Sequence, residues 1–164
     1  IIPAGSKMKY RSNVPKYSEF LFEIVDPTFH DRAGSIRDAG KHNIIVAGVS
    51  YGQGSSREHA ALCPMYMGVK AVIAKSLERI HTANLINFGI IPLTFTSNED
   101  YDDIDQGDEI EIPNIRTIIK EGGKLIARDK TKGTEFELAY HLSDRQKETI
   151  LAGGTLAYMK TRSA

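Results

Sequence analysis

Three short apolar runs, separated by helix-like stretches, constrain the fold of this chain more than any other feature. The runs cover residues 44–48, 71–74 and 90–95. Short apolar runs without strict alternation are typical of strands that are covered on both faces. The stretches between them, residues 56–67 and 77–88, are each followed by a glycine, as helices often are. Strands that alternate with helices in this way predict a short, mainly parallel sheet with helices packed on it.

Two residues refine the predicted helices. Pro64 lies inside the first one and predicts a kink, because proline removes a backbone donor from the helix interior. Ser76 directly precedes the second helix, where a serine side chain can accept a hydrogen bond from a free amide. We therefore expect the first helix to begin at Ser56 and the second to begin at Leu77.

The N-terminal forty residues read as largely irregular. A short helix is expected at residues 18–22 and a longer one at 27–38, where Asp26 precedes a proline at the first helical position. Proline is tolerated there because the amide that it lacks would have no partner inside the helix.

The C-terminal third carries the signals of antiparallel strands. Residues 109–112 and 135–138 alternate between polar and apolar side chains, and turns with glycine or proline separate the runs. A final helix is predicted to begin at Ser143, where Gln146 completes a capping box, and to stop at a pair of glycines. Together these patterns predict one α/β domain over residues 1–164, with a parallel unit and an antiparallel β appendage.

Composition excludes several classes of function. The chain has 21 basic and 21 acidic side chains, so its formal net charge is zero, and it has no run of lysine and arginine. We therefore expect neither a nucleic-acid nor a membrane partner, whereas a few local arginines suffice for small anions. Cys63 is the single cysteine, which excludes an internal disulfide and a motif of paired cysteines. A reducing compartment such as the cytoplasm suits this composition.

The segment with the clearest chemical content is Tyr51-Gly-Gln-Gly-Ser-Ser-Arg-Glu-His-Ala60. Its glycines allow left-handed backbone angles and a close approach to the main chain. A helix N-terminus presents unpaired amides and favours negative charge, and Arg57 adds a guanidinium that fits a carboxylate. These features predict an anion site that contains two serine hydroxyls. The alternative is structural: Ser55 and Ser56 cap a helix, and Arg57 lies on a solvated face.

This segment is part of a longer resemblance to the aconitase family. The residues from Gly54 to Ala60, Gly-Ser-Ser-Arg-Glu-His-Ala, are similar to the signature of that family. The resemblance covers most of residues 1–96 and the rest of the chain more loosely. It includes Ile2-Pro3-Ala4-Gly5, Tyr10-Arg11-Ser12-Asn13, Gly68–Ser76, Arg79-Ile80-His81, Asn84–Asn87 and Gly89–Phe95. The resemblance implies the fourth, swivelling domain of a single-chain, bacterial-type aconitase, with a three-layer β/β/α fold.

The resemblance also implies roles for individual residues. Ser55 matches the catalytic base of the family, and Ser56 and Arg57 match residues that bind the substrate carboxylates. Arg11 is the best match for a further substrate-binding arginine. A free serine is a poor base, and it becomes an effective one where amide donors and positive charge stabilise its alkoxide in a dry site.

Three neighbouring residues are expected to support this turn: Gly54, Glu58 and His59. Gly54 permits the turn, and Glu58 is an acid in the first helical turn, which the helix dipole favours. His59 has two interpretations. It either orients the serine turn or packs as a structural histidine.

The activity implied by the resemblance is the stereospecific dehydration and rehydration that converts citrate to isocitrate through cis-aconitate. In the family the departing hydroxyl leaves toward the open iron of a 4Fe–4S cluster, whose ligands belong to the other three domains. This chain is therefore expected to bind no metal itself. Its expected partners are those domains of the same polypeptide, or a large subunit, together with a tricarboxylate substrate. Because the chain starts at Ile1 without a methionine, we expect a fragment of a longer protein, inactive alone.

Two alternatives stay open at this point. Small subunits of 3-isopropylmalate or homoaconitate dehydratases have a similar length, although the isopropylmalate family usually shows glutamine where this chain has His59. Some aconitase relatives lose their cluster and bind messenger RNA, but the balanced charge of this chain argues against a regulatory RNA-binding role.

Overall fold

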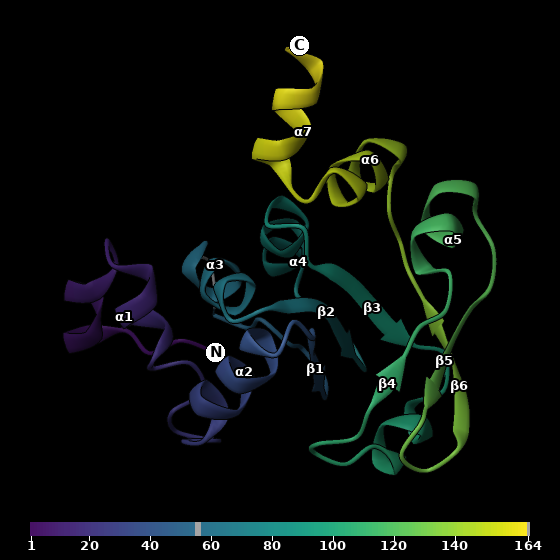
Figure 1. Ribbon diagram of the computed structural model, residues 1–164, viewed down its shortest axis with the longest axis horizontal. Helices are drawn as coiled ribbons and strands as arrows, with labels where there is room; N and C mark the ends of the chain where they lie inside the picture. Colours follow the sequence, from purple (N-terminus) through teal and green to yellow (C-terminus); the bar gives the residue numbers. More distant parts are fainter. Residues whose placement is uncertain (55–56, 164) are drawn as a thin grey trace.

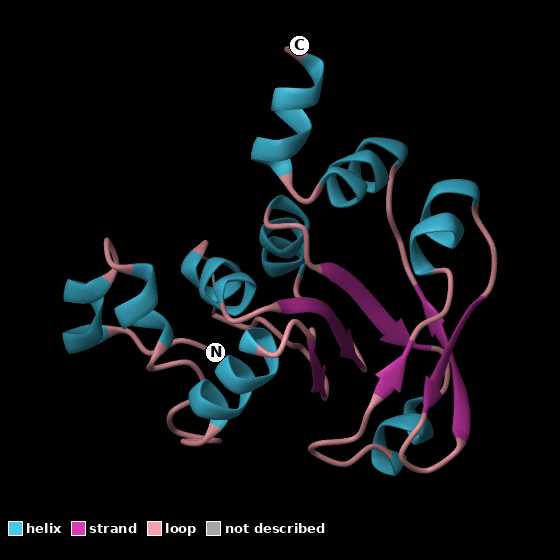
Figure 2. Ribbon diagram, viewed as in Figure 1, coloured by secondary structure: helices cyan, strands magenta, loops and turns pink. Residues whose placement is uncertain are grey.

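A single six-stranded sheet organises the chain in the computed structural model, which describes residues 1–54 and 57–163. Its spatial order is β1-β2-β3-β6-β5-β4. The first three strands pair in parallel and the others pair antiparallel. The strands are β1 (Asn43–Ala47), β2 (Val69–Ala74), β3 (Ile91–Phe95), β4 (Ile110–Glu111), β5 (Leu125–Asp129) and β6 (Thr134–Ala139). The predicted appendage is thus continuous with the parallel unit, through the pairing of β3 with β6 (Figure 2).

The helices connect these strands and cover one side of the parallel unit (Figure 1). Helix α3 joins β1 to β2, and α4 joins β2 to β3. The α-helices are α1 (Val14–Ser18), α2 (Phe29–Asp38), α3 (His59–Tyr66), α4 (Arg79–Asn87), α5 (Ile115–Glu121), α6 (Asp144–Ala152) and α7 (Thr155–Arg162). Two 3-10 helices are η1 (Gly5–Tyr10) and η2 (Asn98–Asp103). Within the described residues, none of these helices is long and apolar enough to cross a membrane.

The alternation of side chains along β2 separates two hydrophobic cores. Ala71 and Ile73 belong to a cluster that includes Leu125 and Phe136 of the antiparallel strands. Val72 belongs to a second cluster, which includes Ala61 of α3 and Leu85 of α4, and Val69 joins this cluster because the pairing register of β2 shifts by one residue between Val69 and Ala71. Successive side chains of a strand point to opposite faces, so the antiparallel half packs on one face of β2 and the helices pack on the other. The result is the β/β/α arrangement of three layers that was predicted.

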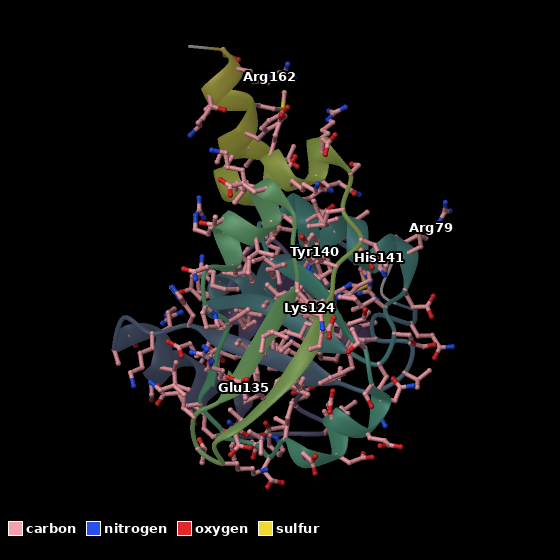
Figure 3. All side chains as sticks on the ribbon, turned by 90° about the vertical axis from the view of Figure 1, so that its right-hand side faces the viewer. Arg79, Lys124, Glu135, Tyr140, His141 and Arg162 are labelled. Carbon is pink, nitrogen blue, oxygen red and sulfur yellow. The ribbon has the colours of Figure 1, made fainter. Side chains whose placement is uncertain are left out.

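The antiparallel layer has a polar outer face (Figure 3). Its exposed side chains pair across and along the strands, as in the ion pairs between Lys124 and Glu137 at 2.6 Å and between Arg128 and Glu135 at 2.7 Å. Such exposed pairs contribute little to stability. They mark this face as the solvated side of the layer.

A third cluster fastens the N-terminal segment to the helical layer. It contains Tyr17, Leu21, Ala33, Cys63 and Met67, all of which are buried. Cys63 is a free thiol inside α3, and burial raises its pKa. The single cysteine therefore serves in packing, as its isolation in the sequence indicated.

Two predicted helix starts are wrong. Helix α3 begins at His59, and the two residues directly before it, Arg57 and Glu58, are not helical; the predicted start at Ser56 lies outside the described residues. Helix α4 begins at Arg79 and not at Leu77, since the hydroxyl of Ser76 accepts a hydrogen bond from the Ser50 amide (2.7 Å) and is not used as a cap. A contact outside the helix therefore accounts for the later start of α4.

Other elements were misplaced or not predicted. The first short helix covers residues 14–18 and not 18–22, because Asn13 caps it and Pro15 lies in its first turn. Strand β5 and helices α5 and α7 were not predicted. The capping box of Ser143 and Gln146 is confirmed, and α6 ends at the predicted glycines.

The junction of α4 with α6 is too close for any side chain. A Cβ atom on Gly89, at the end of α4, would lie 2.7 Å from the carbonyl carbon and oxygen of Gly153. Gly89 also has a left-handed φ of +71°. Gly133 has nearly the same angle, +73°, but a Cβ atom there would meet nothing within 4 Å. These two positions therefore separate the cost of the backbone angle from the cost of the close contact.

We expect Gly89→Ala to destabilise the chain more than Gly133→Ala. The control should lose about 1–2 kcal/mol, the cost of a left-handed angle for alanine. Gly89→Ala should lose roughly 1–3 kcal/mol more, the usual cost of overpacking. Urea denaturation followed by circular dichroism measures both free energies of unfolding. Equal losses would show that the close junction is not rigid.

Candidate functional site

The predicted glycine turn lies at the carboxyl ends of β1 and β2, which is where open α/β sheets bind ligands. It is held there by backbone hydrogen bonds to the loop that follows β2. The amide of Tyr51 donates to the carbonyl of Ser76 (3.0 Å), and the amide of Glu78 donates to the carbonyl of Tyr51 (2.9 Å). Tyr51 and Leu77 thereby form an isolated parallel bridge beyond the sheet. The turn is an extension of the sheet edge.

The turn packs directly against His81, the third residue of α4. A Cβ atom on Gly52 would lie only 2.3 Å from the Cβ atom of His81, so no side chain fits at this position. The ring of Tyr51 meets the ring of His81 edge to face, with centroids 5.2 Å apart. Gly52 is therefore required for a close approach, whereas Gly54, with φ +71° and open space around it, is required for its angle.

The groups beneath the turn are neutral near pH 7. His81 is fully buried, and its two ring nitrogens have no hydrogen-bond partner among the described residues. The pKa of His81 is lowered to about 4, mainly by burial and to a smaller extent by the positive charge of the Ile1 amino group. Burial also raises the pKa of Tyr51, whose hydroxyl is likewise unpartnered in the part of the chain that is described. An uncharged floor lies under the turn.

Arg11 and the start of α3 are connected by His59. Nε2 of His59 lies 2.9 Å from the carbonyl oxygen of Arg11. A carbonyl can only accept, so this nitrogen carries the proton and donates. The other side of the His59 ring meets the edge of Tyr17, at 5.4 Å between centroids, and the hydroxyl of Tyr17 donates to the carbonyl of Pro3 (2.9 Å). His59 thus packs as a structural residue and also places the Arg11 backbone beside the motif.

The surroundings of Arg11 are basic. Nζ of Lys7 lies 3.7 Å from the centroid of the Phe20 ring, and Nζ of Lys9 lies 5.1 Å from that of Tyr10. Lys7 pairs with Glu23, whereas neither Lys9 nor the exposed Arg11 has an acidic partner within 4 Å among the described residues. Positive charge that is not neutralised favours anions at this end of the molecule.

The remaining predicted residues lie as follows. Ser55 and Ser56 fall outside the described residues, between Gly54 and Arg57. Arg57 is half-buried, and its Nη1 atom is buried without a hydrogen-bond partner in the described part of the chain. Glu58 is exposed and immediately precedes α3, where its side chain makes no capping hydrogen bond. The Nη1 donor of Arg57, which follows the two serines in the sequence and bonds to no described residue, agrees with the predicted binding of an anion.

His81 and Tyr51 are the residues that the sequence reading missed. His81 was noted within the family resemblance, but no chemistry was assigned to it. The sequence feature that could have pointed to His81 is Gly52, because a glycine often marks a position where another group lies close to the backbone. The sequence could not identify that group, because it comes from a helix 29 residues further along the chain.

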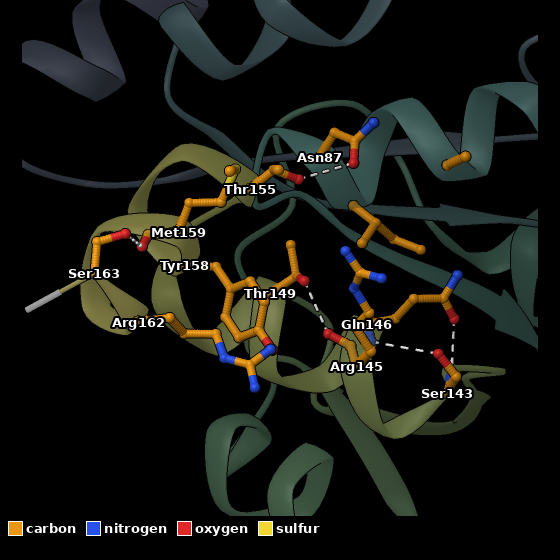
Figure 4. A pocket seen from close by; sticks show the side chains of 12 residues that line it. Asn87, Ser143, Arg145, Gln146, Thr149, Thr155, Tyr158, Met159, Arg162 and Ser163 are labelled. Carbon is orange, nitrogen blue, oxygen red and sulfur yellow. Dashed lines mark hydrogen bonds between the residues drawn. The ribbon is translucent and has the colours of Figure 1, made fainter.

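A separate cleft lies between α4, α6 and α7 (Figure 4). It has a volume of about 700 Å³, and its walls include Arg145, Thr149 and Arg162. Arg162 is already engaged, since its Nη1 donates to the hydroxyl of Tyr158 (3.1 Å), which in turn donates to Glu148 (2.7 Å). Among the predicted site residues that the structure describes, none lines this cleft.

Residues 3–98, more than half of the chain, match the sequence model of the aconitase C-terminal domain. The chain therefore belongs to the family of aconitase C-terminal domains. This region contains the glycine turn, Arg11 and the whole parallel unit. The family resemblance stated from the motif is confirmed.

Named relatives agree with this family. The chain is 39% identical over 184 residues to a protein of Emericella nidulans named as a mitochondrial aconitate hydratase, with 99% of this chain and 23% of that protein covered. It is 35% identical over 136 residues to the mitochondrial homocitrate dehydratase of Saccharomyces cerevisiae, with 81% and 16% covered. The chain thus spans less than a quarter of the length of these relatives. The bacterial type stays a prediction.

A solved structure agrees with the fold. The 3-isopropylmalate dehydratase of Methanocaldococcus jannaschii is similar with a TM-score of 0.70 and 29% identity, over 92% of this chain and 79% of that one. The swivelling-domain type of β/β/α fold is therefore confirmed. The names of these relatives differ in substrate, and all of them are hydratases or dehydratases.

His81 should make the stability of this chain depend on pH. The folded pKa, about 4, lies below the ordinary value of 6.5. The unfolded chain therefore binds a proton as the pH falls below about 6.5, while the folded chain does not, and stability is lost down to about pH 4. Between pH 7 and pH 4.5 the wild type should lose about 2–3 kcal/mol more than His81→Phe, since each pKa unit corresponds to about 1.4 kcal/mol. Urea denaturation at both pH values measures the difference. Parallel losses in the two proteins would contradict a buried neutral histidine.

Proposed function

We propose that this chain is the swivelling domain of an aconitate hydratase and carries its catalytic base. The observation that carries the proposal is that the family match covers the glycine turn, and that this turn lies at the ligand-binding edge of the parallel strands. The reaction that we propose is the conversion of citrate to isocitrate through cis-aconitate. It places this chain among the hydro-lyases.

In the proposed mechanism, Ser55 removes the proton from the carbon beside a substrate carboxylate. Ser56 and Arg57 bind one carboxylate, and Nη1 of Arg57 offers a charged donor that no described residue uses. Arg11, whose backbone carbonyl accepts a hydrogen bond from His59, binds a second carboxylate. Two fixed carboxylates orient the substrate, so that the base faces one carbon atom.

The neutral floor under the turn supports this chemistry. The His81 ring and the Tyr51 hydroxyl are buried and uncharged at neutral pH, so they add no charge that competes with the arginines. A floor of low polarity also strengthens the attraction between a guanidinium and an anion. Both effects favour the serine alkoxide that the reaction requires.

We propose that the cluster of the complete enzyme is bound by other domains. In the described part of this chain, no three side chains of histidine, cysteine, aspartate or glutamate gather into a possible metal site. The proposed partners are the three cluster-bearing domains of the same polypeptide, or a large subunit, and the chain alone should be inactive. Val49 and Ile80 flank the turn and are 74% and 57% exposed, which favours a protein surface covering this edge. The proposed location is the cytoplasm, although the named relatives are mitochondrial.

A second candidate is the small subunit of a 3-isopropylmalate or homoaconitate dehydratase. The archaeal structure and the yeast relative favour it, because both act on related carboxylates according to their names. Rates with citrate, 3-isopropylmalate and homoaconitate, measured on the enzyme assembled with its cluster-bearing part, distinguish the candidates. The highest kcat/KM with citrate supports our proposal, and the highest value with another substrate replaces it.

Replacing Ser55 with alanine in the assembled enzyme should abolish most of the turnover. A positioned acid or base contributes on the order of 10²- to 10⁴-fold, so kcat should fall by that factor while KM changes little. Formation of cis-aconitate, followed by ultraviolet absorbance, measures the rate. Ser97→Ala, at an exposed serine distant in sequence, is the control and should keep normal turnover. A fully active Ser55→Ala enzyme would assign the base elsewhere.

Replacing Arg57 with lysine should weaken substrate binding as well as turnover. Lysine keeps the charge but loses the paired donors that match a carboxylate. We expect KM to rise by roughly tenfold, the equivalent of about 1.4 kcal/mol. The control is Arg128→Lys on the outer face of the antiparallel layer, where the arginine forms an ion pair with Glu135. An unchanged KM for Arg57→Lys would remove Arg57 from the substrate site.

A further inference from the structure

His81 is fully buried, and neither of its two ring nitrogens forms a hydrogen bond with a described residue. A neutral imidazole carries a proton on one nitrogen and a lone pair on the other. Buried polar groups in native proteins are rarely left without a partner, and those that are often have a functional role.

The position of His81 connects it to the glycine turn. Its Cβ, Cγ and Cδ2 atoms are the three nearest to the Cβ position of Gly52, at 2.3, 2.4 and 2.6 Å. The ring of Tyr51, with its unpartnered hydroxyl, lies against the same imidazole. Asn84, one turn further along α4, has an amide nitrogen that is also buried and unpartnered in the described structure.

The turn and α4 cannot move independently of each other. The amide of Glu78, which immediately precedes α4, donates to the carbonyl of Tyr51. Gly52 contacts His81, which is the third residue of α4 and lies three residues after Glu78. A change in the His81 side chain is therefore transmitted directly to the backbone that leads into the serine segment.

We propose that His81 is a positioning residue, whose imidazole holds the glycine turn in the geometry that the substrate requires. The contact between His81 and Gly52 determines the distance between the glycine turn and α4. The ring nitrogens supply hydrogen bonds to the turn and to Tyr51 that form when the site binds its anion. His81 does not touch the substrate, and it acts through Tyr51 and Gly52. This inference rests on the proposed function, because it assigns His81 to the same site.

The first experiment follows the ring itself and needs no catalysis. Long-range nitrogen NMR of the chain labelled with ¹⁵N-histidine reports which ring nitrogen of His81 carries the proton. We expect one tautomer at pH 7, and we expect its nitrogen shifts to change when citrate is added to the assembled protein. Shifts that citrate leaves unchanged, while other signals of the turn move, would overturn the proposal.

The second experiment separates hydrogen bonding from packing. His81→Phe keeps the ring shape without nitrogens, whereas His81→Asn and His81→Gln each replace one nitrogen with an amide. In the assembled enzyme, we expect kcat of the phenylalanine variant to fall by roughly 10- to 100-fold, the effect of a misplaced site, with KM within about threefold. One of the two amide variants should recover most of that loss. Exposed His141, changed to phenylalanine, is the matched control and should behave as the wild type.

The outcomes distinguish this inference from the proposed function. Normal kcat in His81→Phe assigns His81 to packing alone and overturns the inference. Equal losses in all three variants, in step with their melting temperatures, do the same. If the wild type does not act on citrate but the nitrogen shifts respond to another carboxylate, the proposed substrate is wrong while the positioning role of His81 is supported.

Discussion

Burial of β2 on both faces is the constraint on which the rest of this structure depends. Val69 and Val72 contact the helical layer, and Ala71 and Ile73 contact the antiparallel layer. The strand therefore joins two hydrophobic cores that would otherwise be separate. Because its neighbours β1 and β3 pair with it in parallel, the loops that leave all three strands emerge at one edge. The glycine turn owes its position to this edge.

The site combines a neutral interior with a cationic rim. The chain as a whole has no net charge, so the anion affinity that we propose must arise from local arrangement. Arg57 has a donor that pairs with none of the described residues, and a hydrogen bond from His59 connects the Arg11 backbone to the start of α3. Under the turn, the His81 ring and the Tyr51 hydroxyl are uncharged at neutral pH. Neither of these two groups would oppose a carboxylate that approaches this edge.

Family membership and partial length together bear on where the rest of the proposed reaction site would lie. It spans less than a quarter of the relatives that it matches, and the described residues offer no cluster of metal ligands. In the proposed enzyme the base and the cluster belong to different domains, so catalysis requires the two to meet. Exposed apolar side chains beside the turn, at Val49 and Ile80, agree with such a meeting surface.

Much of the fold and of the site could be predicted from local patterns in the sequence. The apolar runs indicated the three parallel strands, and the capping box of Ser143 and Gln146 indicated α6. These features succeed because strand burial and helix capping are properties of neighbouring residues. The anion site that the motif indicates beside Arg57 stays a prediction. The same reasoning failed at β5 and at α7, whose short segments lack distinctive patterns and are stabilised by packing.

The tertiary structure alone decided the contacts between residues that are distant in the chain. Ser76 looked like a helix cap, but its hydroxyl accepts the amide of Ser50, 26 residues earlier. His59 had two interpretations until its ring was found to donate to Arg11, 48 residues away. Gly52 indicated that another group lies close to the backbone of the turn, but only the tertiary structure shows that this group is His81. Sequence by itself determined the family, the elements and the chemical groups, because these depend on local order. The partner of each group depends on how the layers pack, which no local pattern encodes.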